Sequence, residues 1–251
     1  MASLLGRVAV VTGAARGLGK AIAIGLARAG CDVALCSRSP RDLETVAERI
    51  LRDSGRRVYW QGVNVASAAE VAKFSDAACT ALGPVSILIN NAAGWVDADY
   101  LEASPEDIET TIDVTLKGPI WMARSFWRQL KETAPSHIVN ITSLGARPSR
   151  SNASPAYVAA KFGASGLTES LRRYAVRDNI KVTEILPGSI ASKFDIDDGS
   201  EAVSRSYGNG RVPVSDYVEA VLFALTRSPM SVVEDISIAS VQDYKTDYST
   251  Y

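Results

Sequence analysis

The sequence predicts an α/β fold in which helices cover both faces of a doubly wound, seven-stranded parallel sheet. Two observations support this prediction. Short β-branched runs alternate with amphipathic stretches of helical period along the chain, as in repeated βα units. A glycine turn, residues 13–19, follows the first of these runs directly and leads into a helical stretch. No repeat, low-complexity tract or linker divides the chain, so one domain over residues 1–251 is expected.

The expected strands are short apolar or β-branched runs that end in small or polar residues. They cover residues 7–12, 32–37, 57–63, 86–90, 137–143, 180–186 and 232–238. Helices are expected between them, where caps, prolines and acidic first turns mark the starts and glycines mark the stops. They cover residues 18–29, 40–53, 67–82, 104–131 and 215–226, and a further helix follows Ser154.

Composition excludes several classes of partner. The 251 residues are 47% hydrophobic, enough for one large globular core. The 27 basic and 28 acidic residues nearly cancel, so neither nucleic acid nor an anionic membrane is favoured as a partner. The first seven residues lack the apolar core of a signal peptide, and no stretch approaches the roughly 18 apolar residues of a membrane span. We therefore expect a cytoplasmic protein.

The cysteines and the single histidine exclude several kinds of site. Cys31, Cys36 and Cys79 have neither paired nor metal-type spacing, so no disulfide and no metal site are expected. His137 opens a strand-like run that holds it roughly 20 Å from Ser143 at the other end. Catalysis in open parallel sheets lies at the carboxyl ends of the strands. A Ser-His-Asp hydrolase or a His-ligated metal enzyme is therefore not expected.

The glycine turn favours a nucleotide site. Gly13, Gly17 and Gly19 allow a sharp turn and let a diphosphate approach the backbone N–H groups at the helix N-terminus. The alternative is a tight loop without a ligand. The position between a buried strand and an amphipathic helix argues against that alternative.

The next strand indicates which nucleotide binds. An NAD site carries Asp or Glu about 20 residues after the glycine turn, whereas this chain has Ser37 and Arg38. The planar guanidinium of arginine suits a phosphate, and the missing carboxylate removes a repulsion, so NADP is predicted. Arg16, inside the turn, is a second candidate for this phosphate. The alternative is that both arginines are solvated loop residues.

Catalytic candidates follow the fourth and fifth strands. Tyr157 and Lys161 lie one helical turn apart and share a face. A nearby cation lowers the pKa of a phenol from about 10 toward the range of a general acid or base. Ser143 ends the fifth strand, and Asn90 ends the fourth, where we expect it to face the nucleotide. The alternatives are a surface Tyr and Lys pair, a turn serine and a turn-forming asparagine.

Taken together, these residues resemble the short-chain dehydrogenase/reductase family, in particular its NADP-dependent ketoreductase-type members, over roughly residues 5–240. The matching motifs are Thr12-Gly-x-x-x-Gly-x-Gly19, Asn90-Asn-Ala, Ser143, Tyr157-x-x-x-Lys161 and Pro187-Gly188. The resemblance implies a single-domain Rossmann fold. It also implies that Tyr157 is the general acid/base and that Ser143 orients and polarises the substrate oxygen. Lys161 is then implied to lower the pKa of the tyrosine while bonding the nicotinamide ribose.

The same resemblance places NADP(H) in the glycine turn and along the carboxyl ends of the strands. Ser192 stands where family members often hold the nicotinamide carboxamide with Thr or Ser. The residues expected to bind the cofactor are Gly13, Arg16, Gly17, Leu18, Gly19, Ser37, Arg38, Asn64, Val65, Asn91, Ala92, Tyr157, Lys161, Pro187, Gly188, Ile190 and Ser192.

The chain departs from the family pattern at four places. Thr115, counted with the catalytic residues, replaces an Asn whose side chain is thought to support a proton-relay water at a helix kink. A contact through the backbone carbonyl would survive this change. Asn64 replaces an Asp at the adenine pocket, and Ala93 replaces the Gly of Asn-Asn-Ala-Gly. The last strand ends at 237–240 without the usual glycine pair, so the tail of about 241–251 has no predicted place.

Two functions remain open. The first is an NADP(H)-dependent oxidoreductase that transfers hydride between the nicotinamide and a carbonyl or secondary alcohol. The second is a non-catalytic NADP-binding sensor or scaffold on the same fold. The intact Ser143, Tyr157 and Lys161 favour the enzyme. By resemblance, apolar side chains on the helices from 104 and 154 pair across a two-fold axis in a homodimer or homotetramer. These side chains are Trp121, Phe126, Trp127, Phe162 and Leu167.

The wall of the substrate site is expected from the segments after the fourth, fifth and sixth strands. A lid of about 189–213, polar from Lys193 on, is interpreted as mobile. An aromatic floor with arginines at its mouth favours a medium-sized substrate that has a ring or chain and an anionic or hydroxylated part. Solvated loop arginines are the equally open alternative. The residues of this wall are Trp95, Tyr100, Arg147, Ser149, Arg150, Phe194 and the lid up to Arg211.

Overall fold

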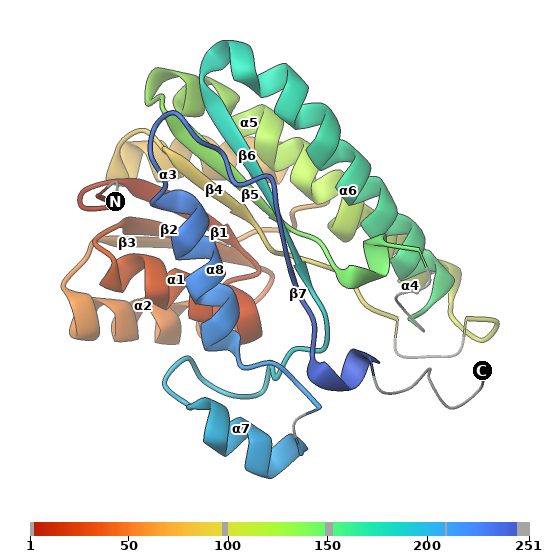
Figure 1. Ribbon diagram of the computed structural model, residues 1–251. Coiled ribbons are helices and arrows are strands. Elements are labelled where there is room, and N and C mark those ends of the chain that lie inside the picture. The colour runs from red at the N-terminus through yellow and green to blue at the C-terminus, as the bar shows by residue number, and fades with distance from the viewer. Residues whose placement is uncertain (1–2, 97–99, 149–152, 209, 245–251) are drawn as a thin grey trace.

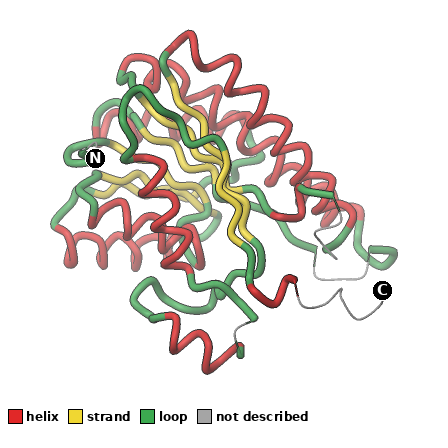
Figure 2. Tube along the Cα trace, viewed as in Figure 1, coloured by secondary structure: helices red, strands yellow, loops and turns green. Residues whose placement is uncertain are grey.

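The computed structural model describes residues 3–96, 100–148, 153–208 and 210–244. Seven strands form one parallel sheet in the order β3-β2-β1-β4-β5-β6-β7 (Figure 1). Figure 2 shows helices on both faces of this sheet. The strand order reverses between β1 and β4, as in a doubly wound sheet. The predicted fold class is confirmed.

The strands lie close to the predicted ranges, and two of their ends differ by more than one residue. β5 stops at Ile141, so Ser143 lies in the loop after it. β7 begins only at Asp235, because the side chains of Lys181 and Thr183 on β6 bond the preceding carbonyls in place of a strand ladder. The strands are β1 Val8–Thr12, β2 Asp32–Ser37, β3 Val58–Gly62, β4 Ile87–Asn90, β5 Ser136–Ile141, β6 Ile180–Pro187 and β7 Asp235–Ile238.

Helices follow most strands, as predicted. None of them, within the part of the chain that is described, is long and apolar enough to cross a membrane. Short 3₁₀ turns also occur, namely η2 Leu144–Ala146, η3 Val176–Asp178 and η4 Val241–Tyr244. The helices are α1 Gly17–Arg28, α2 Pro40–Ser54, α3 Ala68–Leu82, α4 Pro105–Ile112, α5 Gly118–Glu132, α6 Pro155–Ala175, α7 Ser200–Tyr207 and α8 Val214–Leu225.

Alternate residues of the central strands enter two separate cores. Ala9 and Val11 of β1 join the core beneath α1, α2 and α8. Val8 and Val10 join the core beneath α3 and α5 on the other face. Successive side chains of a strand point to opposite faces, so a strand covered on both sides is apolar at every position. This burial explains the continuous apolar runs of the sequence.

The helix expected over 104–131 is interrupted. α4 and α5 are joined by η1, a π-helical turn over Asp113–Lys117. Pro119 has no N–H to donate to the carbonyl of Thr115, four residues earlier. The N–H of Gly118 bonds five residues back instead of four. The apolar period continues through the turn, so periodicity alone indicates one helix.

The segment interpreted as a lid contains α7, which the sequence pattern does not predict. The start of the segment is held against α1 and α2 by ion pairs. Asp195 lies 2.7 Å from both Lys20 and Arg49, and Asp197 lies 2.7 Å from Arg28. These pairs tie the beginning of the segment to the body of the fold.

His137 is the second residue of β5 and is 3% exposed. Its Nε2 lies 2.8 Å from Oγ1 of Thr183 on β6. Burial lowers the pKa of His137 to about 3, so the ring stays neutral. The histidine therefore lies at the amino end of its strand, as predicted, and away from the catalytic edge.

Candidate active site

Ser143 and Tyr157 meet at the carboxyl edge of the sheet. Ser143 lies two residues past β5, and its Oγ accepts a hydrogen bond from the Gly145 N–H at 3.0 Å. Tyr157 lies in the first turn of α6, which Pro155 starts. The Ser143 hydroxyl is near enough to the Tyr157 phenol to counter part of the rise in its pKa. The structure thus brings together two of the predicted catalytic side chains.

Lys161 lies one turn further along α6 and is 4% exposed. Its Nζ donates to the carbonyl of Ile141 at 3.0 Å and lies 5.6 Å from the centroid of the Tyr157 ring. Burial lowers the pKa of Lys161 to about 8, and the charge of Glu184 opposes this shift. An ammonium buried beside a phenol at a ligand-binding edge is a candidate for function. The alternative of a solvated surface pair is excluded.

The pKa of Tyr157 moves in the direction opposite to the sequence expectation. Burial raises it, and the hydrogen bond with Ser143 opposes this rise without reversing it. The ring of Trp95 covers the phenol in an edge-to-face contact, with the ring centroids 4.8 Å apart. The sequence shows the nearby cation, whereas the desolvation depends on packing. The phenol is therefore held in its protonated form.

Thr115 lies in the π turn and is 2% exposed. Its Oγ1 accepts a hydrogen bond from the Gly94 N–H at 3.0 Å, which ties the loop after β4 to the helix. A Cβ at Gly94 would lie 2.6 Å from Cα of Thr111, so this close approach requires glycine. The side-chain hydroxyl of Thr115 is thus occupied by the hydrogen bond to Gly94. A contact with the proton-relay water would have to use the backbone carbonyl of Thr115.

The glycine turn has the shape that a diphosphate site requires. Gly13 and Gly17 have φ angles of 65° and 55°, in the left-handed region that favours glycine. A Cβ at Gly19 would lie 2.2 Å from the carbonyl oxygen of Gly13, so no side chain fits there. Leu18 is buried, and the side chain of Arg16 does not cap the N–H groups at the start of α1. Uncapped N–H groups at a helix start suit a phosphate.

Thr12 and Asn91 hold the turn against the end of β4. Oγ1 of Thr12 accepts from the N–H groups of Asn91 and Ala92, each at 2.9 Å. Nδ2 of Asn91 donates to the Thr12 carbonyl at 3.0 Å. The expectation that Asn90 faces the nucleotide is wrong, because its buried side chain donates to Asn140 at 2.8 Å. Neighbouring residues of a strand point to opposite sides, so Asn91 takes the place near the turn.

The residues expected at the adenosine end lie in the glycine turn and at or just after the ends of β2 and β3. Arg16 and Arg38 are exposed, so both guanidinium groups are accessible to a phosphate. Oγ of Ser37 accepts from the N–H two residues on at 3.1 Å and shapes the turn. Asn64 closes its own turn through Oδ1, which accepts from the N–H two residues on at 3.1 Å. Val65 beside it is buried.

The remaining cofactor candidates approach the turn from the end of β6, whose last residue is Pro187. The N–H of Gly188 donates to a β7 carbonyl at 2.8 Å. Ile190 forms an isolated parallel bridge to the chain just before α8. A Cβ at Gly17 would lie 3.4 Å from Cβ of Ser192. Ser192 therefore lies against the glycine turn.

The family model of the short chain dehydrogenases matches residues 7–202, which is most of the chain. The chain belongs to the short chain dehydrogenase family. The matched range contains the glycine turn, Ser143, Tyr157 and Lys161. The protein is thus an oxidoreductase of this NAD(P)-using family, and its candidate site lies inside the matched range.

Known oxidoreductases resemble this short chain dehydrogenase along nearly its whole length. An uncharacterized oxidoreductase of Staphylococcus aureus (strain USA300) is 30% identical over 242 residues, which cover 96% of this chain and 100% of that protein. An alcohol dehydrogenase of the archaeon Thermococcus sibiricus, complexed with 5-hydroxy-NADP, is 28% identical with a TM-score of 0.81, covering 94% of this chain and 97% of that chain. A metagenomic short-chain oxidoreductase in complex with NADP is 27% identical with a TM-score of 0.79, covering 95% and 99%.

Arg147 of this short chain dehydrogenase forms ion pairs with carboxylates of the sheet. Its Nη2 lies 3.2 Å from Oε2 of Glu184 and 3.7 Å from Oδ2 of Asp235. A buried carboxylate needs a partner, so the guanidinium is drawn toward the sheet. The recognition of an anionic part of the substrate by Arg147 stays a prediction, and in this structure the guanidinium is engaged by the two carboxylates. Ser149 and Arg150 of the expected wall lie outside the described residues.

Sequence reasoning misses Glu184 as a candidate for function. This carboxylate of β6 is 2% exposed. An ionisable residue within the strand-like run 180–187, directly before three apolar positions, is the signal that would have found it. Thr12 is missed in a different way, since it belongs to the glycine motif but only the structure shows that its hydroxyl holds Asn91 and Ala92.

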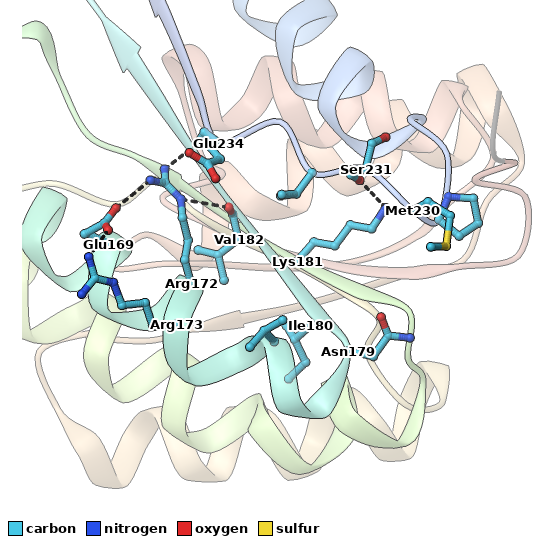
Figure 3. A pocket seen from close by; sticks show the side chains of 13 residues that line it. Glu169, Arg172, Arg173, Asn179, Ile180, Lys181, Val182, Met230, Ser231 and Glu234 are labelled. Atoms are coloured by element: carbon cyan, nitrogen blue, oxygen red, sulfur yellow. Dashed lines mark hydrogen bonds and ion pairs between the residues drawn. The ribbon is translucent and has the colours of Figure 1, made fainter.

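A cavity of about 480 Å³ lies elsewhere, at the amino-terminal end of β6 (Figure 3). Glu169, Arg172, Arg173 and Lys181, which line it, have partners. Nζ of Lys181 donates to the carbonyls of Ser228 and Ser231, and Arg172 pairs with Glu169 at 3.0 Å. None of the candidate catalytic residues lines it. The candidate catalytic residues lie instead at the opposite, carboxyl edge of the sheet.

Proposed function

We propose that the protein is an NADP(H)-dependent oxidoreductase that transfers hydride between the nicotinamide and a carbonyl or secondary alcohol, with Tyr157 as the general acid/base. The observation that carries this proposal is the convergence of the Tyr157 phenol, the Ser143 hydroxyl and the buried Lys161 ammonium, whose Nζ lies 5.6 Å from the centroid of the Tyr157 ring. A purely structural role does not need a phenol, a hydroxyl and an ammonium to converge where parallel sheets bind ligands.

The residues of the chain fit both the binding of NADP(H) and the transfer of a proton to or from the substrate oxygen. The glycines and the uncapped start of α1 accept a diphosphate, and the exposed Arg16 and Arg38 accept an additional phosphate. When bound, NADP(H) supplies or accepts the hydride. In the reductive direction Tyr157 donates its proton to the carbonyl oxygen, and the Ser143 hydroxyl polarises that oxygen. The raised pKa of Tyr157 favours the protonated acid, and the charge of Lys161 stabilises the phenolate that remains.

NADP(H) is expected to bind more tightly than NAD(H). Ser37 and Arg38 stand where an NAD site carries an acid. Replacing Ser37 by Asp and Arg38 by Leu should reverse the order, because a carboxylate bonds the ribose hydroxyls and repels the 2′-phosphate. Fluorescence titration of both proteins with NADPH and NADH measures the four Kd values. Tighter binding of NADH by the native protein would contradict this interpretation of the loop.

The competing function is a sensor or scaffold that binds NADP without chemistry. A panel of ketones and aldehydes, followed through NADPH absorbance, separates the two, with the matching alcohols and NADP⁺ for the reverse direction. NADPH oxidation that depends on an added carbonyl supports the enzyme. Saturable NADPH binding without turnover on any member of the panel supports the sensor.

Trp95 guides the choice of substrates for this panel. Its side chain is 58% exposed, and its ring packs edge-on against Tyr157. A carbonyl held by Tyr157 and Ser143 brings its substituent toward this indole. We therefore propose carbonyl compounds that carry a ring or an apolar chain as the first substrates. An anionic group is not required, because Arg147 is engaged by Glu184.

We also propose that the protein forms a homodimer or homotetramer through α5 and α6. Phe162 on α6 is 42% exposed, whereas Phe126 on α5 is fully buried in the core and cannot contribute. Trp127 is half-buried and donates to Asp178 at 2.8 Å. Light scattering at micromolar concentration should give a molar mass that is a multiple of the 26.8 kDa of one chain. Phe162→Ser should lower this molar mass. The mass of a single chain for the native protein would overturn this proposal.

A further inference from the structure

A row of polar side chains crosses the sheet beneath α6. The strand register aligns Asn140 with Glu184 and Glu184 with Asp235. Asn140 donates to Thr168 of α6 at 2.8 Å, so this row is on the face that α6 covers. Glu184 is 2% exposed. A carboxylate is therefore buried directly under the helix that carries the candidate acid/base.

The two oxygens of Glu184 hold the loop that follows β5. Oε1 accepts from Oγ1 of Thr142 at 2.6 Å, and Oε2 accepts from Nη2 of Arg147 at 3.2 Å. Nη1 of the same arginine donates to Oγ of Ser165 on α6 at 2.9 Å. Ser143 lies between the two loop residues that Glu184 binds. One continuous chain of bonds thus joins β6, the loop of the candidate serine and the candidate catalytic helix.

Packing alone gives no reason for a charge at this position. The neighbours of Glu184 along β6 are buried, and an apolar side chain would fill the place without desolvation. A buried ion pair is weak evidence for stability, because desolvation offsets much of the attraction between the charges. Polar groups that are buried at such a cost are often used for positioning or for tuning a neighbouring group.

We propose that Glu184 and Arg147 are positioning residues for the reaction, and that this pair braces the loop of Ser143 against the helix of Tyr157 and Lys161. The inference rests on the function proposed above for these three side chains. Glu184 and Arg147 act through the groups that they hold. The bonds to Thr142 and Ser165 are the means by which they do so.

The same pair acts on the charge of Lys161. Burial lowers the pKa of Lys161, and the negative charge of Glu184 opposes this effect. Loss of the Glu184 charge should therefore lower the pKa of Lys161 further, whereas loss of the Arg147 charge should raise it. Among the described residues, the charged or titratable groups in contact with this cluster are Tyr157 and Arg172 of α6, Glu184 of β6, Asp235 of β7 and Arg147 of the loop after η2.

The test compares Glu184→Gln with Arg147→Gln in the full-length protein. The reductive kcat is measured against pH with saturating NADPH and an accepted carbonyl. Lys161 is titrated in parallel by NMR of ¹³Cε-labelled lysine, assigned with Lys161→Arg. Both variants should lower the plateau of kcat at least tenfold. The alkaline fall of kcat and the Lys161 titration should move down by about one pH unit in Glu184→Gln and up in Arg147→Gln.

Asp32→Asn is the matched control. Asp32 is also a buried strand carboxylate, and it pairs with Arg56 at 2.6 Å and with Arg57 at 2.8 Å at the amino end of β2. Asp32→Asn should lower the melting temperature as much as Glu184→Gln does and leave the pH profile of kcat unchanged. Glu184→Asp should recover part of the lost kcat. If Glu184→Gln does not fold, Arg147→Gln carries the test by itself, through the upward shift of the Lys161 titration and the loss of kcat.

The outcomes separate this inference from the proposed function. An unmoved Lys161 titration in Glu184→Gln, with a loss of kcat no larger than in Asp32→Asn, overturns the brace. A native protein without turnover, in which Glu184→Gln still lowers the Lys161 pKa, refutes the proposed oxidoreductase and supports the brace. Shifts of opposite sign in the two variants support it when they come with a loss of kcat in both that Asp32→Asn does not show.

Discussion

Replacing Tyr157 by Phe is expected to lower turnover by about 10²–10⁴-fold, the usual contribution of a general acid or base. The substitution removes the transferable proton and keeps the ring that packs against Trp95. The fold and the affinity for NADPH should therefore stay close to native. Steady-state kcat with an accepted carbonyl, the NADPH Kd by fluorescence and a thermal melt measure these three properties.

Tyr59→Phe is the matched control for this prediction. It removes a hydroxyl that donates to Gln61 at 2.8 Å on β3, at the far edge of the sheet. That loss should cost about 0.5–1.5 kcal/mol of stability and leave kcat unchanged. Near-native turnover of Tyr157→Phe, or an equal loss in both variants, would refute the role assigned to Tyr157.

Gly19→Ala is expected to weaken NADPH binding more than tenfold and to lower thermal stability. The new methyl would lie 2.2 Å from the Gly13 carbonyl oxygen and 2.4 Å from Nδ2 of Asn91. The first of these atoms is backbone, so the turn itself must shift. Overpacking of this kind costs about 1–3 kcal/mol, and about 1.4 kcal/mol lost from binding already corresponds to a factor of ten. NADPH titration and a thermal melt measure the two effects.

Gly199→Ala provides the comparison for Gly19→Ala. Gly199 has φ −65° and ψ 162°, an extended conformation that alanine also adopts, and no atom lies within 4 Å of the added Cβ. We expect a change in stability within about 0.5 kcal/mol and native affinity for NADPH. Native affinity in the Gly19 variant as well would mean that the turn does not hold the cofactor.

The sheet, most of its helices and the glycine turn could be predicted because each depends on local pattern. A strand that is covered on both faces is apolar throughout, as Val8, Ala9, Val10 and Val11 show by entering two cores. A helix with one buried face repeats its apolar residues at helical spacing. The turn needs glycine wherever its backbone takes a positive φ, as at Gly13.

The breaks in this pattern could not be predicted from periodicity. The apolar period runs unbroken from α4 to α5, although Pro119 removes a helical hydrogen bond and η1 forms. α7 lies in a segment whose polar sequence resembles a loop, and ion pairs such as Asp195 with Arg49 hold the start of that segment against α2. The first feature follows from a local proline that the apolar period does not reveal, and the second depends on contacts with parts of the chain that are remote in sequence.

The one-turn spacing of Tyr157 and Lys161 is a property of the sequence, because helical geometry places residues four apart on one face. The electrostatics of the site is decided only by the tertiary structure. Burial raises the pKa of Tyr157 against the opposing effect of Ser143, and Arg147 turns to Glu184. Desolvation and charge partners set these outcomes, and only the folded chain brings such remote groups within hydrogen-bonding distance.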